Sequence, residues 1–81
     1  MYYTYALYSR KYDKIYVGST SDIDKRVANH NEGKSRYTKS YIPWELIYYE
    51  EFVTRSSAMK REKELKTHQG RDFIRKKISV G

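Results

Sequence analysis

The chain lacks cysteine altogether, and it has little proline or glycine: one proline and four glycines among 81 residues. Without cysteine there are no disulfides and no thiolate metal sites, which fits a reducing compartment. No apolar run approaches the ~18 residues of a membrane span, and the first residues lack the basic-then-apolar order of a secretory signal. The sequence therefore predicts a cytoplasmic protein that makes no use of a membrane.

Acidic residues are also scarce relative to basic ones, with 10 Asp and Glu against 17 Lys and Arg, for a net charge of +7. The segment from Arg55 to Lys77 contains nine basic and three acidic residues, so six of the seven net positive charges lie there. Such a field attracts polyanions, so nucleic acid is the leading partner. Repeats and linkers are absent, and a chain of this length supports one small core. We expect a single domain over residues 1–81.

Three segments rich in aromatic and β-branched residues, 2–9, 15–19 and 44–53, are typical of strands. The first two are separated by a short polar turn, which predicts an antiparallel hairpin with Tyr5 and Tyr16 as neighbours. The third carries apolar residues on both faces, so we expect it to be the longest strand and to be covered on both sides.

A first helix is predicted from about residue 22 to about residue 31, because Gly18 ends the second strand and Ser21 with Asp24 resembles a capping box. Residues four apart share a helix face, so Arg26 and His30 should point the same way. Arginine donors suit a phosphate, and tyrosine and histidine move protons, so this stretch predicts a phosphodiester site. Residues 34–43 have no period and read as an exposed loop.

A second helix, capped by Thr54 or Ser56, is predicted to run to about residue 68. Gly70 is then expected to break the chain before a short last helix over residues 71–78. In the second helix Glu62 falls near the middle of an apolar stripe that includes Leu65, where a carboxylate needs an explanation. A weak surface ion pair with Lys66, four residues on, is the simplest alternative.

The chain resembles the GIY-YIG nuclease family, and in particular its short stand-alone bacterial members, over nearly its whole length. Tyr3-Thr4-Tyr5 stands where the family has its GIY triplet, keeping the final tyrosine, and Tyr16-Val17-Gly18 stands where it has YIG. The spacing from Tyr5 through Tyr16 and Arg26 to His30 looks like the family's tyrosine, tyrosine, arginine, histidine series. Glu62 matches its metal-binding glutamate.

The resemblance implies an α+β fold with a three-stranded antiparallel sheet flanked by about three helices. It implies a DNA endonuclease that holds one Mg²⁺ or Mn²⁺ ion at Glu62 and hydrolyses phosphodiester bonds. Tyr16, with Tyr5, would take or relay a proton from the attacking water. Arg26 would bind the phosphate and supply positive charge, and His30 would orient the water or act as a second acid–base group.

The basic side chains outside this series are candidate nucleic-acid contacts, which position a backbone without reading sequence: Lys34, Arg36, Lys39, Arg61, Arg71, Arg75, Lys76 and Lys77. Homing and repair members of the family target DNA through extra domains. With no recognition helix visible here, cleavage is expected to be structure-directed, weakly sequence-specific, or guided by a protein partner.

One departure from the family pattern supports a second hypothesis. Many active members carry an asparagine late in the chain, and this sequence has none after Asn31, with Gln69 as the nearest substitute. The alternative is therefore a catalytically inactive nucleic-acid-binding module of the same fold.

Overall fold

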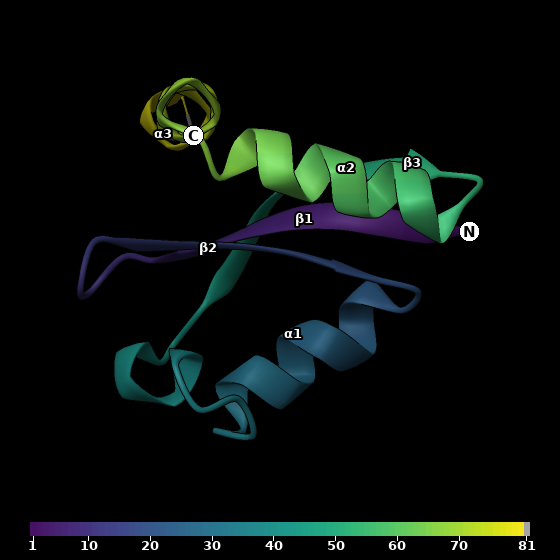
Figure 1. The fold of residues 1–81 in the computed structure, drawn as a ribbon. Helices are drawn as coiled ribbons and strands as arrows, with labels where there is room; N and C mark the ends of the chain where they lie inside the picture. The colour runs from purple at the N-terminus through teal and green to yellow at the C-terminus, as the bar shows by residue number, and fades with distance from the viewer. Residues whose placement is uncertain (81) are drawn as a thin grey trace.

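A computed structural model describes residues 1–80, in which a three-stranded antiparallel sheet lies between two helical layers (Figure 1). Helix α1 covers one face of the sheet, and helices α2 and α3 cover the other. This α+β arrangement confirms the predicted fold class. In chain order the elements are β1 (Tyr2–Ser9), β2 (Lys14–Thr20), α1 (Ile23–Asn31), the 3₁₀ helix η1 (Thr38–Tyr41), β3 (Glu45–Phe52), α2 (Arg55–Leu65) and α3 (His68–Val80).

Strand β1 is the centre of the sheet, with β2 on one side and β3 on the other. The predicted hairpin of β1 and β2 is confirmed: Tyr5 lies opposite Gly18, and Leu7 lies opposite Tyr16. Side chains two residues apart in a strand share a face, so Tyr5 and Tyr16 point to the same side. Their ring centroids are 6.4 Å apart, as neighbours should be.

Strand β3 is an edge strand, and the prediction that it is covered on both faces is wrong. Its face toward α3 is packed, with Tyr48 edge-on to Phe73, but Leu46 and Tyr49 on the other face are exposed. The reason lies outside the strand, because α1 has only nine residues and packs on β1 and β2 rather than on β3. Nor is β3 the longest strand, since β1 has the same eight residues.

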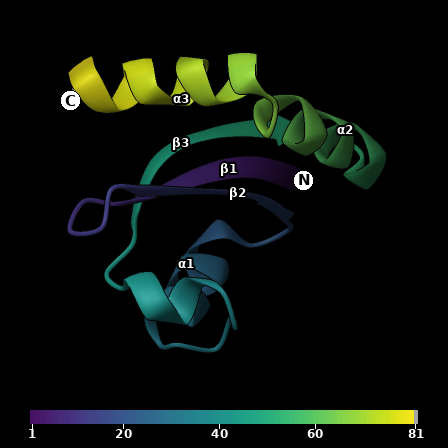
Figure 2. The ribbon, with the colours of Figure 1, turned by 60° about the vertical axis from the view of Figure 1, so that its left-hand side comes forward.

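The sheet separates two apolar clusters. On the α2 and α3 side, Ala6 and Val17 pack with Leu65 and Ile74, and Figure 2 shows α3 lying beyond β3 on the side opposite α1. On the α1 side the buried members are Tyr5, Leu7 and Trp44. The alternating side chains of β1 thus belong to both clusters, which is why its central residues are buried.

The start of α1 differs from the expected capping box at Ser21 and Asp24. Asp22 is the N-cap, and its Oδ1 accepts a hydrogen bond from the backbone N–H of Lys25 at 3.1 Å. Thr20 in turn accepts from the Asp22 N–H at 3.1 Å, which fixes the chain entering the helix. A carboxylate cap also suits the positive end of the helix dipole.

The segment after α1 is also more ordered than the predicted exposed loop. It contains η1, whose first residue Thr38 is fully buried. The backbone carbonyl of Thr38 accepts from the indole N–H of Trp44 at 2.8 Å. The Asn31 side chain bonds both the N–H and the carbonyl of Trp44, at 2.7 and 2.9 Å. These bonds hold η1 against the sheet.

Helix α2 is capped by Thr54, as predicted, through a bond from the Ser57 N–H of 3.1 Å. The prediction that Gly70 breaks the chain is wrong, because α3 already begins at His68. Thr67 Oγ1 accepts from the Gly70 N–H at 3.2 Å, as a helix cap does. Gly70 is needed for a different reason: a β-carbon there would collide with the backbone of α2 at Leu65.

Candidate active site

Side chains from four elements meet where β2 passes Gly18. A cavity of about 470 Å³ is lined by Tyr5 of β1, Tyr16 of β2, Arg26 of α1 and Glu62 of α2. We call it the β2-edge cavity. Arg26 and Glu62 come from opposite helical layers, and they share one cavity because β2 is the outermost strand on this side. Its other lining residues are Gly18, Ser19, Arg55 and Met59.

Gly18 makes room for the Tyr5 hydroxyl. A β-carbon at residue 18 would lie 2.7 Å from Tyr5 Oη and 3.1 Å from a ring carbon of Tyr16. The Tyr5 side chain is fully buried and so cannot swing into solvent. The glycine of the Tyr-Val-Gly triplet is therefore a spatial requirement of the cavity. The prediction that it ends the strand is wrong, because β2 continues to Thr20 and stays paired with β1.

A buried hydrogen-bonded chain runs from the cavity into η1. Tyr5 Oη lies 3.1 Å from His30 Nε2, and His30 Nδ1 lies 2.7 Å from Thr38 Oγ1. All three residues are buried. His30 does not line the β2-edge cavity itself. It lines an adjoining hollow of about 260 Å³ with Tyr16, Arg26 and Lys34, so the predicted common face of Arg26 and His30 is confirmed.

Burial sets the protonation of this chain. It raises the pKa of Tyr5 from 10.0 to about 12; the Arg26 guanidinium opposes this shift, while Tyr16 and Glu62 add to it. Burial, followed by the charge of Arg26, lowers the pKa of His30 below its ordinary value. At neutral pH, Tyr5 therefore carries its proton and His30 is neutral. We assign Tyr5 as the donor to Nε2, which leaves the Nδ1–H of His30 to donate to Thr38.

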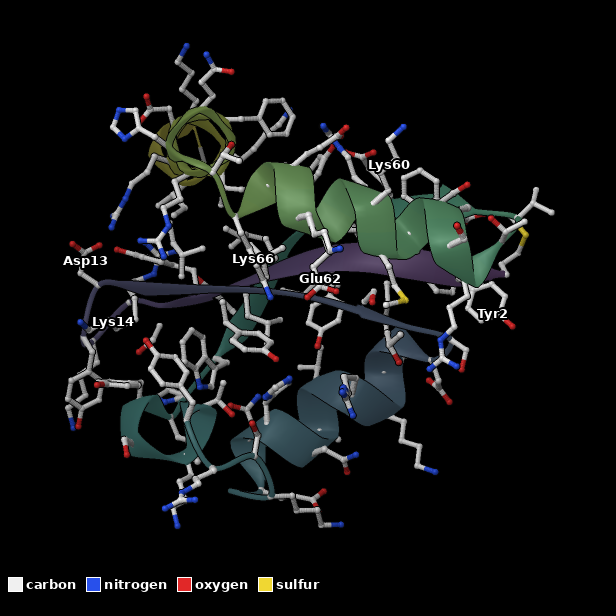
Figure 3. The ribbon with its side chains drawn as sticks, in the orientation of Figure 1. Tyr2, Asp13, Lys14, Lys60, Glu62 and Lys66 are labelled. Atoms are coloured by element: carbon white, nitrogen blue, oxygen red, sulfur yellow. The ribbon has the colours of Figure 1, made fainter. Side chains whose placement is uncertain are left out.

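Glu62 is held in place by two neighbours. Its Oε1 accepts from Ser19 Oγ at 2.8 Å, and its Oε2 pairs with Lys66 Nζ at 2.7 Å. Figure 3 shows Glu62 and Lys66 reaching from α2 toward β2, whereas Lys60 points away from the sheet. The simple alternative of an ion pair with Lys66 is thus present in the structure, alongside the cavity.

The expectation that Glu62 lies in the middle of a buried stripe needs correction. Its side chain is 22% exposed. Leu65 is buried, but Met59, an apolar residue one turn before Glu62 on the same helix, is exposed. Glu62 sits at the border of the buried face, where a carboxylate keeps contact with water.

The donor set around Glu62 is compatible with a weakly held divalent cation. No group of three or more acidic, histidine or cysteine side chains that could hold a metal occurs within residues 1–80. Mg²⁺, however, is commonly bound by one or two carboxylates together with water and substrate phosphate oxygens. A single carboxylate facing an open cavity beside Arg26 fits that pattern, with Glu62 as the protein ligand.

The predicted nucleic-acid contacts divide into three groups: side chains engaged in packing or in an ion pair across the fold, side chains beside the site, and exposed side chains elsewhere. Arg61 is paired with Glu50 and Glu64 and lies over Phe73, and Lys77 lies over Tyr48 and Phe73. Both side chains therefore belong to the packing of β3, α2 and α3. Arg75 reaches the turn between β1 and β2, where it pairs with Asp13 at 2.6 Å.

Lys34 and Arg71 lie beside the site. Lys34 lines the hollow that contains His30. Arg71 lines a third hollow of about 220 Å³ with Tyr16, Tyr37 and Lys66. The remaining predicted contacts are exposed side chains: Arg36, Lys39 and Lys76.

Sequence reasoning missed Ser19, Thr38 and Arg55 as members of the site. Ser19 follows Gly18 directly, so its place at the cavity was available from the hairpin, but its bond to Glu62 joins residues 43 positions apart. Gln69, the nearest substitute for a late asparagine, lies elsewhere. It lines a hollow between α2 and α3 with Arg61 and Phe73.

The chain is similar in sequence to a known protein family and to individual proteins. A family model described as the GIY-YIG catalytic domain matches residues 1–77. A UPF0213 protein of Staphylococcus epidermidis is 47% identical over 55 residues, which are 67% of this chain and 67% of that protein. A UPF0213 protein of Haloquadratum walsbyi is 40% identical over 57 residues, 69% of this chain and 64% of that protein.

Among solved structures, the solution NMR structure of the UPF0213 protein BH0048 from Bacillus halodurans is similar to this chain, with a TM-score of 0.54 and 28% identity. The match covers 99% of this chain and 85% of that one. None of the helices in the described part of the chain is long and apolar enough to cross a membrane.

Proposed function

The chain belongs to the GIY-YIG family, and from that premise we propose that it is an endonuclease that hydrolyses phosphodiester bonds of DNA in the β2-edge cavity. One observation carries the proposal: a tyrosine, an arginine and a carboxylate from three different elements line the same cavity. These groups can move a proton, bind a phosphate and hold a cation, which are the three requirements of metal-assisted phosphodiester hydrolysis.

Tyr16 is the better candidate for accepting a proton. The raised pKa of Tyr5 and its bond to His30 Nε2 keep the Tyr5 hydroxyl in the donor state. Tyr16 lies in the cavity and borders both adjoining hollows, so its hydroxyl is the more accessible of the two. In this proposal Tyr16 takes or relays the proton of the attacking water, and Tyr5 positions Tyr16 and His30.

Arg26 would bind the scissile phosphate. Its guanidinium offers several donors to the phosphate oxygens and stabilises the charge that develops on them. His30 is almost completely buried and both of its ring nitrogens have partners, so we assign it the task of holding the Tyr5 hydroxyl rather than contacting water.

Glu62 would hold a Mg²⁺ or Mn²⁺ ion, which when bound supplies electrostatic stabilisation of the phosphate and the leaving oxygen. Ser19 orients the carboxylate through its bond to Oε1. Lys66 compensates the negative charge of Glu62 before the cation and the DNA arrive.

A second candidate function is a binding module without turnover. Both carboxylate oxygens of Glu62 already have protein partners, and Gln69 lies in a hollow outside the site. In that case Lys66 would take the place of the cation permanently, and the basic residues around Tyr16 would bind a nucleic-acid backbone.

A cleavage assay separates the two functions. Single-stranded, duplex, branched and flapped DNA are incubated with Mg²⁺ or Mn²⁺, with wild type beside Glu62→Gln. This substitution keeps the size of the side chain and an acceptor for Ser19 but removes the charge. The endonuclease proposal requires cleavage by wild type that Glu62→Gln abolishes. If wild type cleaves no substrate, or if the variant cleaves equally well, the endonuclease proposal is rejected and the binding module is the remaining function.

A further inference from the structure

The third hollow beside Tyr16 has the composition of a nucleotide site. It holds about 220 Å³, and it combines the Tyr37 ring with the cationic side chains of Lys66 and Arg71. We call it the Tyr37 hollow. Tyr37 is 51% exposed and stacks against Tyr16 with an interplanar angle of 29°. The ring thus extends the aromatic surface of the candidate active site outward into solvent.

The charge of the surrounding side chains separates Tyr37 from Tyr49, the tyrosine of equal exposure. Tyr49 on β3 is equally exposed, at 51%, but its hollow is lined by Asp22, Asp24 and Glu51 and would repel a phosphate. Exposed aromatic residues are ordinary on protein surfaces. An exposed ring beside two cations and next to a phosphodiester site is the less ordinary combination, and it is the one that single-stranded nucleic-acid grooves use.

The two cationic side chains, Lys66 and Arg71, differ in the ion pairs that they make. Lys66 is paired with Glu62 at 2.7 Å and so links the Tyr37 hollow to the β2-edge cavity. Arg71, near the start of α3, makes no ion pair with another residue between 1 and 80, so its guanidinium can turn to a phosphate. Tyr16 lines both the Tyr37 hollow and the β2-edge cavity, so a phosphate between Lys66 and Arg71 would lie beside the site proposed for the phosphate at Arg26.

We propose that Tyr37, Lys66 and Arg71 form a subsite for one unpaired nucleotide of DNA, with its base stacked on Tyr37 and its phosphate between the two cations. A base offers its flat face to a protein ring only when it has left the base stack. The hollow, at about 220 Å³, is also smaller than the ~300–1,000 Å³ typical of ligand pockets, which suits a single base. The inference rests on the proposed function, since it names the substrate class: DNA with an unpaired nucleotide beside the scissile phosphate.

The test measures binding in the absence of metal, so that it does not depend on cleavage. Fluorescence anisotropy in EDTA compares a labelled oligothymidine strand with a blunt duplex of equal length. Tyr37→Ala is expected to weaken binding of the single strand roughly tenfold, from the loss of one base stack, and to change duplex binding less than twofold. Tyr37→Phe keeps the ring and should bind as wild type does. Tyr49→Ala, the control of equal exposure, should leave both affinities unchanged.

Two further readouts guard against a variant that misfolds. A 2-aminopurine placed in the strand should be quenched on binding to wild type and to Tyr37→Phe, and less so by Tyr37→Ala. Arg71→Ala, which leaves the ring intact, should lower the slope of log affinity against log salt by about 0.7 for the single strand.

The proposal is overturned if wild type does not bind the single strand, if Tyr37→Ala weakens single-strand and duplex binding equally, or if Tyr49→Ala has the same effect as Tyr37→Ala. Failure of the proposed function looks different. A protein that cleaves nothing but still loses single-strand binding in Tyr37→Ala has the subsite without the nuclease.

Discussion

Replacing Gly18 by alanine tests whether the cavity depends on the close approach of β2 to Tyr5. The added β-carbon would lie 2.7 Å from Tyr5 Oη, 3.0 Å from its Cζ and 3.1 Å from a ring carbon of Tyr16. Carbon atoms in contact are normally separated by ~3.5–4.0 Å, so at least one ring must move. Tyr5 is fully buried and bonded to His30, so movement breaks that bond or distorts the strand pairing.

The loss of stability in Gly18→Ala can be worked out from the crowding by the new methyl group and from the loss of the Tyr5–His30 hydrogen bond. Inserting a methyl group into a packed site costs about 1–3 kcal/mol, and loss of a buried hydrogen bond about 0.5–1.5 kcal/mol. For a domain of this size each 1 kcal/mol lowers the melting temperature by roughly 4–8 °C. With the methyl-group cost alone, Gly18→Ala should therefore melt about 4–24 °C below wild type in a circular-dichroism scan.

A double-mutant cycle makes this prediction specific. Tyr5→Phe removes the atom nearest to the new β-carbon while leaving the ring in place. Gly18→Ala should then cost less in the Tyr5→Phe background than in wild type, with a coupling energy of about 1 kcal/mol. Partial rescue is expected rather than full rescue, because the Tyr16 ring carbon stays close. Equal costs in both backgrounds would refute the role assigned to the Tyr5 hydroxyl.

Three other predictions follow from the packing and from the site. Gly70→Ala should destabilise the protein by about 1–3 kcal/mol or more, measured by urea unfolding, because its β-carbon meets the rigid backbone of Leu65; an unchanged midpoint would contradict the close packing of α2 and α3. Tyr16→Phe should fold normally, bind DNA in EDTA as wild type does, and cleave ~10²-fold or more slowly, whereas parallel losses of binding and rate would assign Tyr16 to binding. Because the pKa of His30 is lowered in the folded protein, its contribution to stability is present above the unfolded pKa near 6.5 and is lost as pH falls toward the lower folded value. His30→Gln should therefore flatten the fall in melting temperature below about pH 6.5, and His68→Gln, at the exposed second histidine, should not.

The strands and the tyrosine pair could be predicted from the sequence because they depend on local pattern. Alternating aromatic residues gave β1 and β2, and a short polar turn between them requires an antiparallel hairpin, which brings Tyr5 close to Tyr16. The common face of Arg26 and His30 follows from helix geometry alone. Their different surroundings do not, since His30 is buried by its contact with Thr38 of η1 while Arg26 stays exposed.

The errors arose where burial depends on a distant element. Strand β3 reads as a fully covered strand, but its outer face is open because α1 is short and lies over the other two strands. Gly70 reads as a helix break, and only the position of the α2 backbone reveals that it is a contact point between helices. Of the site, Glu62 was visible as an anomaly of the helical pattern. The hydrogen bond between Ser19 and Glu62 could not be predicted, because it depends on how α2 packs against β2, which the local sequence does not determine.

Strand β3 is at the edge of the sheet, and its unpaired edge has a consequence for how copies of the protein meet one another. Strand edges expose unpaired main-chain donors and acceptors that can template aggregation. This strand carries Glu45, Glu50 and Glu51 among its eight residues, in a molecule that is otherwise strongly basic. Glu45 and Glu50 are paired with Arg10 and Arg61 of the same chain, so a second β3 strand aligned along this edge would meet charged side chains that must be desolvated before the main chains could pair.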